Sequence, residues 1–101
     1  MAKQEPEKYL MENAVSPGHT TRVDKDKFDD MKAAVLKVLP ADAPGMTPAE
    51  LREAIAPHIS QAFWPNGEKA GWWMKGVQLD LEAKGMIARG STKPVKLYRL
   101  I

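Results

Sequence analysis

Few side chains in this sequence combine the type and the spacing that catalysis requires. The two histidines, His19 and His58, each lack a second ligand or a carboxylate at the spacing of a metal site. Cysteine is absent, which excludes thiolate nucleophiles, disulfides and cysteine-rich zinc sites. The chain also lacks a glycine-rich phosphate loop. We therefore expect a protein that is not an enzyme, with no catalytic residue, no metal and no cofactor.

Positive side chains gather in the last third of the chain and suggest binding instead. Residues 68–101 contain 7 Lys or Arg against 3 Asp or Glu, a net charge of +4, whereas residues 1–67 contain 8 against 10, a net charge of −2. Such an asymmetry is compatible with a negatively charged partner and also with a basic surface that only contacts solvent. The residues predicted to contact nucleic acid are Lys69, Lys75, Gln78, Arg89, Lys93, Lys96 and Arg99.

Two helices are expected before this basic region. The first begins at Asp24, whose carboxylate can cap free amides of the first turn, carries an apolar stripe at helical spacing and ends before Pro40. The second begins with a capping box of Thr47 and Glu50, with a proline at the first helical position. These local signals predict two short helices joined by a loop.

The third helix and a hairpin complete the predicted domain. The helix is expected over residues 68–84, with Gly85 as a left-handed cap. Two short strands follow, within residues 86–89 and 95–101, and Pro94 should lie outside their ladder or at an edge. Three helices followed by a β-hairpin wing is the order of a winged helix-turn-helix domain. The predicted fold class is therefore mainly α, with a small β contribution.

The N-terminal segment differs in composition from the rest of the chain. Residues 1–22 contain Pro6, Pro17 and Gly18, many charges and little periodic apolar content, so we expect an extended or disordered arm. The winged-helix domain would then occupy residues 23–101. The chain has neither the apolar run of a signal peptide nor that of a membrane span, and a cytoplasmic protein is expected.

The third helix should carry apolar side chains on two opposite faces. Its inward face is predicted to consist of Ala70, Met74, Val77 and Leu81. Trp72 and Leu79 fall about 180° away from that face, with Trp73 to one side. Because a contiguous exposed apolar patch usually marks a contact, these three residues form the predicted interaction surface.

Three interpretations of this outer face stay open at this point. The N-terminal arm or the segment FWP could fold over it, a second copy of the chain could pack on it, or the helix could enter the major groove of DNA. Gly71 and Gly76 bear on all three, since each costs up to about 1 kcal/mol of helix propensity relative to alanine. Their presence suggests that something packs closely against the helix backbone.

Four stretches, ENAVSPG, VLP, AGWWMKGVQLDLEAKGMIAR and TKPVKLYR, occur in this order between Glu12 and Ile101. Together they resemble a small bacterial protein family of unknown function with a winged-helix-like fold, and the GWW…VQLDLEAKG tract is the most specific part. The resemblance implies the fold and a bacterial cytosolic protein, but no activity. Winged-helix domains in general imply nucleic-acid binding, although Trp72 and Leu79 stand here where polar residues are usual on the reading face.

These patterns lead to one principal hypothesis and one alternative. The principal hypothesis is a DNA-binding protein of regulatory type. The alternative is a protein-protein interaction or dimerisation module that uses the third helix and binds no nucleic acid. The expected partners are accordingly double-stranded DNA and a second copy of the chain; neither a membrane nor a small-molecule substrate is expected.

Overall fold

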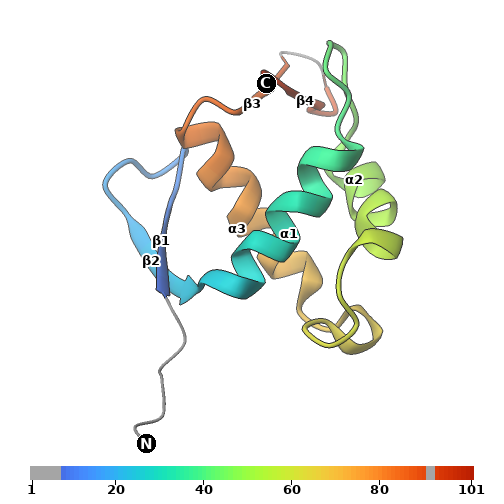
Figure 1. Ribbon diagram of the computed structural model, residues 1–101. Coiled ribbons are helices and arrows are strands. Elements are labelled where there is room, and N and C mark those ends of the chain that lie inside the picture. Colours follow the sequence, from blue (N-terminus) through green and yellow to red (C-terminus); the bar gives the residue numbers. More distant parts are fainter. Residues whose placement is uncertain (1–7, 91–92) are drawn as a thin grey trace, which may run out of the picture.

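The computed structural model describes residues 8–90 and 93–101, which form three helices between two small antiparallel hairpins (Figure 1). In chain order, the elements are β1 (Lys8–Glu12), β2 (Thr20–Asp24), α1 (Lys25–Val38), α2 (Pro48–Ile55), the 3-10 turns η1 (Ala56–His58) and η2 (Pro65–Gly67), α3 (Ala70–Ala83), β3 (Ile87–Arg89) and β4 (Leu97–Arg99). The expected mixture of mainly helix with some strand is confirmed. None of the helices in the described ranges is long and apolar enough to cross a membrane.

Helix α1 has the expected bounds but a different start from the one predicted. Asp24 occupies the N-cap position, yet its side chain makes no capping hydrogen bond. The carboxylate instead pairs with Lys8 across the N-terminal hairpin, and this hydrogen bond holds the pKa of Asp24 below its ordinary value. The predicted capping by Asp24 is therefore wrong, because a cation on the neighbouring strand takes its carboxylate. The helix ends at Val38, two residues before Pro40, as the proline requires.

Helix α2 begins as its sequence predicts. Thr47 Oγ1 accepts a hydrogen bond from the Glu50 amide at 3.1 Å, and Glu50 Oε1 accepts one from the Thr47 amide at 2.9 Å. Both halves of the capping box are present, so two free amides at the helix start are satisfied. Leu51 and Ile55 on the inner face are fully buried.

The segment between α2 and α3 is attached to α1 by one carboxylate. Asp30 Oδ2 accepts hydrogen bonds from the Ser60 amide at 2.9 Å and from Trp64 Nε1 at 3.0 Å. Trp64 is only 1% exposed, so its indole N–H needs this acceptor inside the protein. The irregular segment thereby contributes the largest fully buried side chain of the core.

Helix α3 buries the predicted face and two polar residues besides. Ala70, Met74, Val77 and Leu81 all lie in the core, as expected. The helix is slightly shorter than predicted because Lys69 has a left-handed conformation, φ 62°, and Gly85 ends the last turn at φ 73°. Gln78 and Asp80 are also buried, which the sequence interpretation did not anticipate.

The C-terminal hairpin forms with the expected strands. β3 and β4 are antiparallel, with Ile87 opposite Arg99, and Pro94 precedes the ladder. Met46, in the loop before α2, exchanges backbone hydrogen bonds of 2.9 and 2.7 Å with Leu97 and so extends this hairpin by one bridge. The loop approaches so closely that a Cβ on Gly45 would lie 2.0 Å from the Leu97 carbonyl oxygen. Residues 91–92 of the expected turn lie outside the described ranges.

The segment expected to be an arm is a second hairpin. β1 and β2 pair in antiparallel register, with Tyr9 opposite Val23 and Met11 opposite Thr21. The hairpin packs against α1 and α3, and Met11 and Val23 belong to the core. The expectation of an extended or disordered arm is therefore wrong for residues 8–22, because their alternating apolar side chains pack against α1 and α3; residues 1–7 lie outside the described part.

The close packing expected at the helix glycines is confirmed. A Cβ at Gly76 would lie 2.8 Å from Met11 Cε, and one at Gly71 would lie 2.4 Å from an Arg52 guanidinium nitrogen. Both distances are shorter than a normal contact between heavy atoms. Gly76 thus lets the N-terminal hairpin approach α3, and Gly71 leaves room for a side chain of α2.

Candidate functional site

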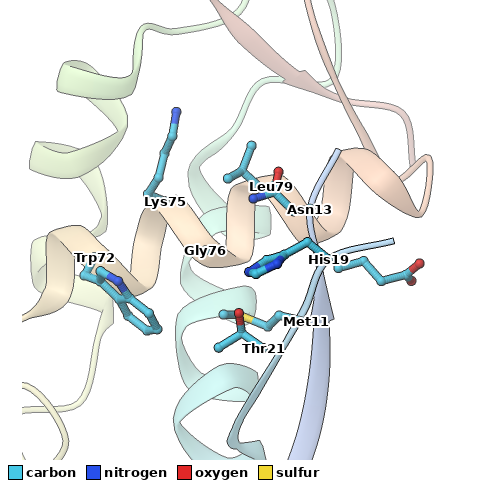
Figure 2. Close-up of a pocket in the computed structure, with 9 residues that line it drawn as sticks. Met11, Asn13, His19, Thr21, Trp72, Lys75, Gly76 and Leu79 are labelled. Atoms are coloured by element: carbon cyan, nitrogen blue, oxygen red, sulfur yellow. The ribbon is translucent and has the colours of Figure 1, made fainter. Parts of the chain in front are cut away.

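A pocket lies between the N-terminal hairpin and the outer face of α3, and we call it the Trp72 groove (Figure 2). Its volume is about 210 Å³. The lining residues are Met11, Glu12, Asn13, His19, Thr21, Trp72, Lys75, Gly76 and Leu79. The hairpin supplies one side and α3 the other, so the groove depends on the docking of two segments that are more than 45 residues apart in sequence order.

The floor and one wall of the groove are apolar. Met11 and Leu79 are buried, whereas Trp72 is 57% exposed. The Trp72 ring makes an edge-to-face contact with Trp73, with 5.5 Å between the ring centroids. Trp73 makes the same kind of contact with Trp64, with 5.2 Å between the centroids. This row of rings links the exposed indole to the core and holds it beside the groove.

The three residues of the predicted interaction surface differ in how far the rest of the chain covers them. Leu79 is only 8% exposed, because the hairpin covers that part of α3. Trp73 is partly buried against the core. Trp72 is largely exposed to solvent. Of the predicted interaction surface of Trp72, Trp73 and Leu79, only the Trp72 ring is therefore mostly accessible to a partner.

Polar side chains surround the apolar floor. Asn13, His19 and Thr21 come from the hairpin, and Lys75 comes from α3; in Figure 2, His19 and Thr21 lie on the side of α3 toward which Trp72 points, whereas the Lys75 side chain extends away from them. Lys75 is exposed and forms no ion pair with any described residue. The Glu12 carboxylate, in contrast, lies 3.3 Å from Lys84 Nζ. The groove therefore carries an unpaired positive charge, and its carboxylate pairs with Lys84 rather than with Lys75.

A buried carboxylate holds the hairpin in place. Asp80 is fully buried in α3 and accepts hydrogen bonds from Tyr9 Oη at 2.9 Å and from the Glu12 amide at 2.8 Å. Lys84 pairs with Asp80 one helical turn away and also donates to Tyr9 Oη. Asp80 thus forms an ion pair on its own helix, and it is buried because the N-terminal hairpin covers this part of α3.

The pKa values of two members of this network are shifted. Burial raises the pKa of Tyr9, and the hydrogen bond to Asp80 adds to the increase, while Lys84 acts in the opposite direction. Partial burial alone would lower the pKa of Lys84, but its hydrogen bonds to Asp80 and Tyr9 outweigh burial and raise it well above the ordinary lysine value. Lys84 therefore stays charged, and Tyr9 stays neutral, around neutral pH.

Two arginines predicted to contact nucleic acid are engaged within the chain. The Arg89 guanidinium forms hydrogen bonds of 2.6 and 3.0 Å with the Glu82 carboxylate, which raises the pKa of Arg89. Arg99 donates from Nε to the Leu39 carbonyl at 2.7 Å and from Nη1 to the Ile101 carbonyl at 3.0 Å. Both side chains thus have structural partners that a nucleic acid would have to replace.

Gln78 and the predicted lysines have other positions. Gln78 is 1% exposed and donates to Glu82 at 3.2 Å, so the expectation that it faces a ligand is wrong. Its Oε1 has no hydrogen-bond partner in the described structure. Lys69 precedes α3, whereas Lys93 and Lys96 precede β4, beyond the opposite end of that helix. The structure does not gather the predicted nucleic-acid residues into one cluster.

Sequence reasoning missed the residues of the hairpin that build the groove. The signal was the alternation of Tyr9 and Met11 on one strand with Thr21 and Val23 on the other, which is typical of a half-buried hairpin. The proline and glycine between these strands favour a loop instead, so the hairpin was not predicted.

In the described ranges, no group of three histidine, aspartate or glutamate side chains could hold a metal ion.

Comparison with known proteins gives a family but no activity. No curated protein and no solved structure matches the chain. A family model described as a family of unknown function, DUF6958, matches residues 8–97, which include the whole Trp72 groove. The chain therefore belongs to this family of unknown function.

Proposed function

We propose that the protein is an interaction module that docks another polypeptide in the Trp72 groove. The observation that carries this proposal is the exposure of Trp72, 57% in a chain whose Trp64 is buried. Tryptophan is the residue type most enriched among those that dominate binding energies, and it does so from the centre of a patch surrounded by polar groups. Trp72 has these surroundings, because polar side chains of the hairpin and Lys75 border the same groove.

The groove has the construction of a peptide site. Its floor consists of Met11, Gly76 and Leu79, and a methionine side chain adapts readily to different apolar shapes. The volume of about 210 Å³ is smaller than the roughly 300–1,000 Å³ of pockets for drug-sized ligands. A side chain of a partner fits this space better than a cofactor does. The ring row from Trp72 through Trp73 to Trp64 keeps the wall rigid, which lowers the entropic cost of binding.

Selection from a random peptide library displayed on phage tests the proposal. The full chain should enrich peptides that the Trp72→Ala variant binds at least about tenfold more weakly, since hot-spot tryptophans contribute about 2 kcal/mol or more. Leu10→Ala is the matched control, because Leu10 is equally exposed, at 57%, but does not line the groove. Selected peptides should bind this control like the unchanged chain.

Two results would defeat the docking proposal. One is the absence of any enriched peptide. The other is enrichment of peptides that bind the Trp72→Ala variant and the unchanged chain with equal affinity.

Regulatory DNA binding is a second candidate, and one observation favours it. The bridge between Met46 and Leu97 adds a further strand position beside the β3–β4 hairpin, an arrangement typical of winged-helix domains. In that fold, α2 and α3 would be the helix-turn-helix and the hairpin would be the wing. Among the residues predicted to contact nucleic acid, the four lysines form no ion pair with a described residue: Lys69, Lys75, Lys93 and Lys96. A bacterial origin and a cytoplasmic location stay predictions.

Salt-dependent binding to random duplex DNA tests this second candidate. If these four lysines each contact one phosphate, the logarithm of the affinity should fall with the logarithm of salt concentration at a slope of about −3.6. The double variant Lys93→Gln, Lys96→Gln should reduce the slope by about 2. Trp72→Ala should leave the slope unchanged. A chain that binds no DNA at low salt would remove this candidate and leave the docking proposal intact.

A further inference from the structure

Resting on the proposed docking function, we infer that the occupant of the Trp72 groove is an acidic segment of another protein. Such a segment presents one large apolar side chain to the floor and at least one Asp or Glu carboxylate to Lys75. The inference joins two features of the same pocket, its apolar floor and its unpaired positive charge.

The unpaired charge of Lys75 favours a negatively charged partner. Lys75 projects from α3 at the edge of the pocket and forms no ion pair within the described ranges (Figure 2). Glu12 is the acidic residue of the lining, and its carboxylate faces Lys84, which also serves Asp80. An incoming carboxylate therefore meets a cation that pairs with no described acid, while the Glu12 carboxylate faces Lys84. An incoming lysine would meet the unpaired ammonium of Lys75 and be repelled.

The same charge argues against a second copy of this chain as the occupant. A two-fold interface uses the same surface patch on both subunits. Two such patches would bring two unpaired Lys75 side chains to one interface, while the Glu12 carboxylate of each lining faces its own Lys84. Opposed charges across an interface favour a chosen partner, whereas like charges exclude a wrong one.

Hydrogen bonding from the hairpin side favours the same occupant. His19 and Thr21 line the groove from β2 and the turn before it, and both can donate a hydrogen bond to a carboxylate oxygen or a backbone carbonyl. Lys75 approaches from α3 on the other side. A carboxylate next to the apolar anchor can therefore accept a hydrogen bond from the hairpin side, while Lys75 on α3 attracts it by charge.

The experiment starts from a peptide chosen in the Trp72-dependent selection. We expect the selected peptides to be enriched in Asp and Glu next to an apolar residue. In the best binder, replacing the acidic residues by Gln should weaken binding about two- to fivefold, the effect of one exposed ion pair, and replacing them by Lys should weaken it further. Lys75→Gln should remove the difference between the acidic and Gln peptides, and Lys75→Glu should reverse the preference in favour of the Lys peptide.

Lys37→Gln serves as the control, since Lys37 is exposed on α1 and does not line the groove. This variant should keep the preference of the unchanged chain. Trp72-dependent binders that contain no acidic residues, or that bind equally well in their Gln form, would overturn the inference while the docking proposal stands. Sedimentation of the chain as a dimer that Trp72→Ala dissociates would also overturn it, because the occupant would then be a second copy. A selection without Trp72-dependent binders would remove the docking proposal itself.

Discussion

Replacement of Trp64 by alanine should lower the free energy of unfolding by about 3–5 kcal/mol, the usual cost of truncating a large buried aromatic side chain. Trp64 is 1% exposed, packs edge to face on Trp73 and donates its indole N–H to Asp30. The substitution removes these contacts and leaves a cavity between the irregular segment and α1. Because small domains have a total stability of about 5–15 kcal/mol, the variant should unfold at a much lower urea concentration.

Trp72→Ala is the matched control for this prediction. The Trp72 side chain is mostly exposed and contacts Trp73 only at an edge, so we expect a loss of at most about 1 kcal/mol. Urea unfolding curves of the two variants should therefore differ widely in midpoint. Equal shifts of the two midpoints would show that the assignment of one ring to the core and the other to the surface is wrong.

Replacement of Asp80 by alanine should lower the free energy of unfolding by about 2–4 kcal/mol, because Tyr9 Oη and the Glu12 amide lose their acceptor and Lys84 loses its buried partner. Tyr9 Oη, the Glu12 amide and Lys84 all donate to this side chain. Lys84 remains about one-third exposed and can regain water, which keeps the loss below that of a fully buried pair. The hairpin should detach first, since it makes two of these three bonds.

Hydrogen exchange measures this second prediction locally. Amides of β1 and β2 should exchange faster in Asp80→Ala, with a smaller change in α1 and in the core half of α3. Asp80→Asn should give an intermediate loss, because the amide oxygen can still accept a hydrogen bond. Glu12→Gln is the control: its carboxylate is 53% exposed, and its pairing with Lys84 contributes at most about 1 kcal/mol. Unchanged exchange in the hairpin of Asp80→Ala would contradict the role given to Asp80.

The placement of the N-terminal hairpin explains why the candidate site was only partly predictable. Trp72 and Leu79 were recognised on one face of α3 from helical spacing, and Lys75 from its charge. The other half of the groove comes from residues 11–21, which precede α3 by about 50–60 positions in the chain. The alternation within the hairpin indicates that one of its faces is buried, but no pattern within the segment indicates that α3 is the surface it covers.

The corrections to the predicted nucleic-acid surface have the same origin. Arg89 and Arg99 are adjacent to a predicted hairpin turn in the sequence, and local pattern gives no indication of their partners. In the folded chain, Arg89 meets Glu82 on α3, and Arg99 meets the carbonyl of Leu39, 60 positions earlier. Charge counts predict a surface field, but tertiary contacts decide which of the charges remain available to a ligand.

Local patterns in the chain are sufficient to predict the three helices, the C-terminal hairpin and the core face of α3. Their signals act within a few residues: the capping box of Thr47 and Glu50 satisfies free amides, Pro40 and Gly85 end helices, and apolar spacing selects a face. Only the tertiary structure decided that Leu79 is covered and Trp72 exposed. The hydrogen bond from Tyr9 to Asp80 joins residues 71 positions apart in the sequence. It contributes to stability only in the folded chain, where the two residues are in contact.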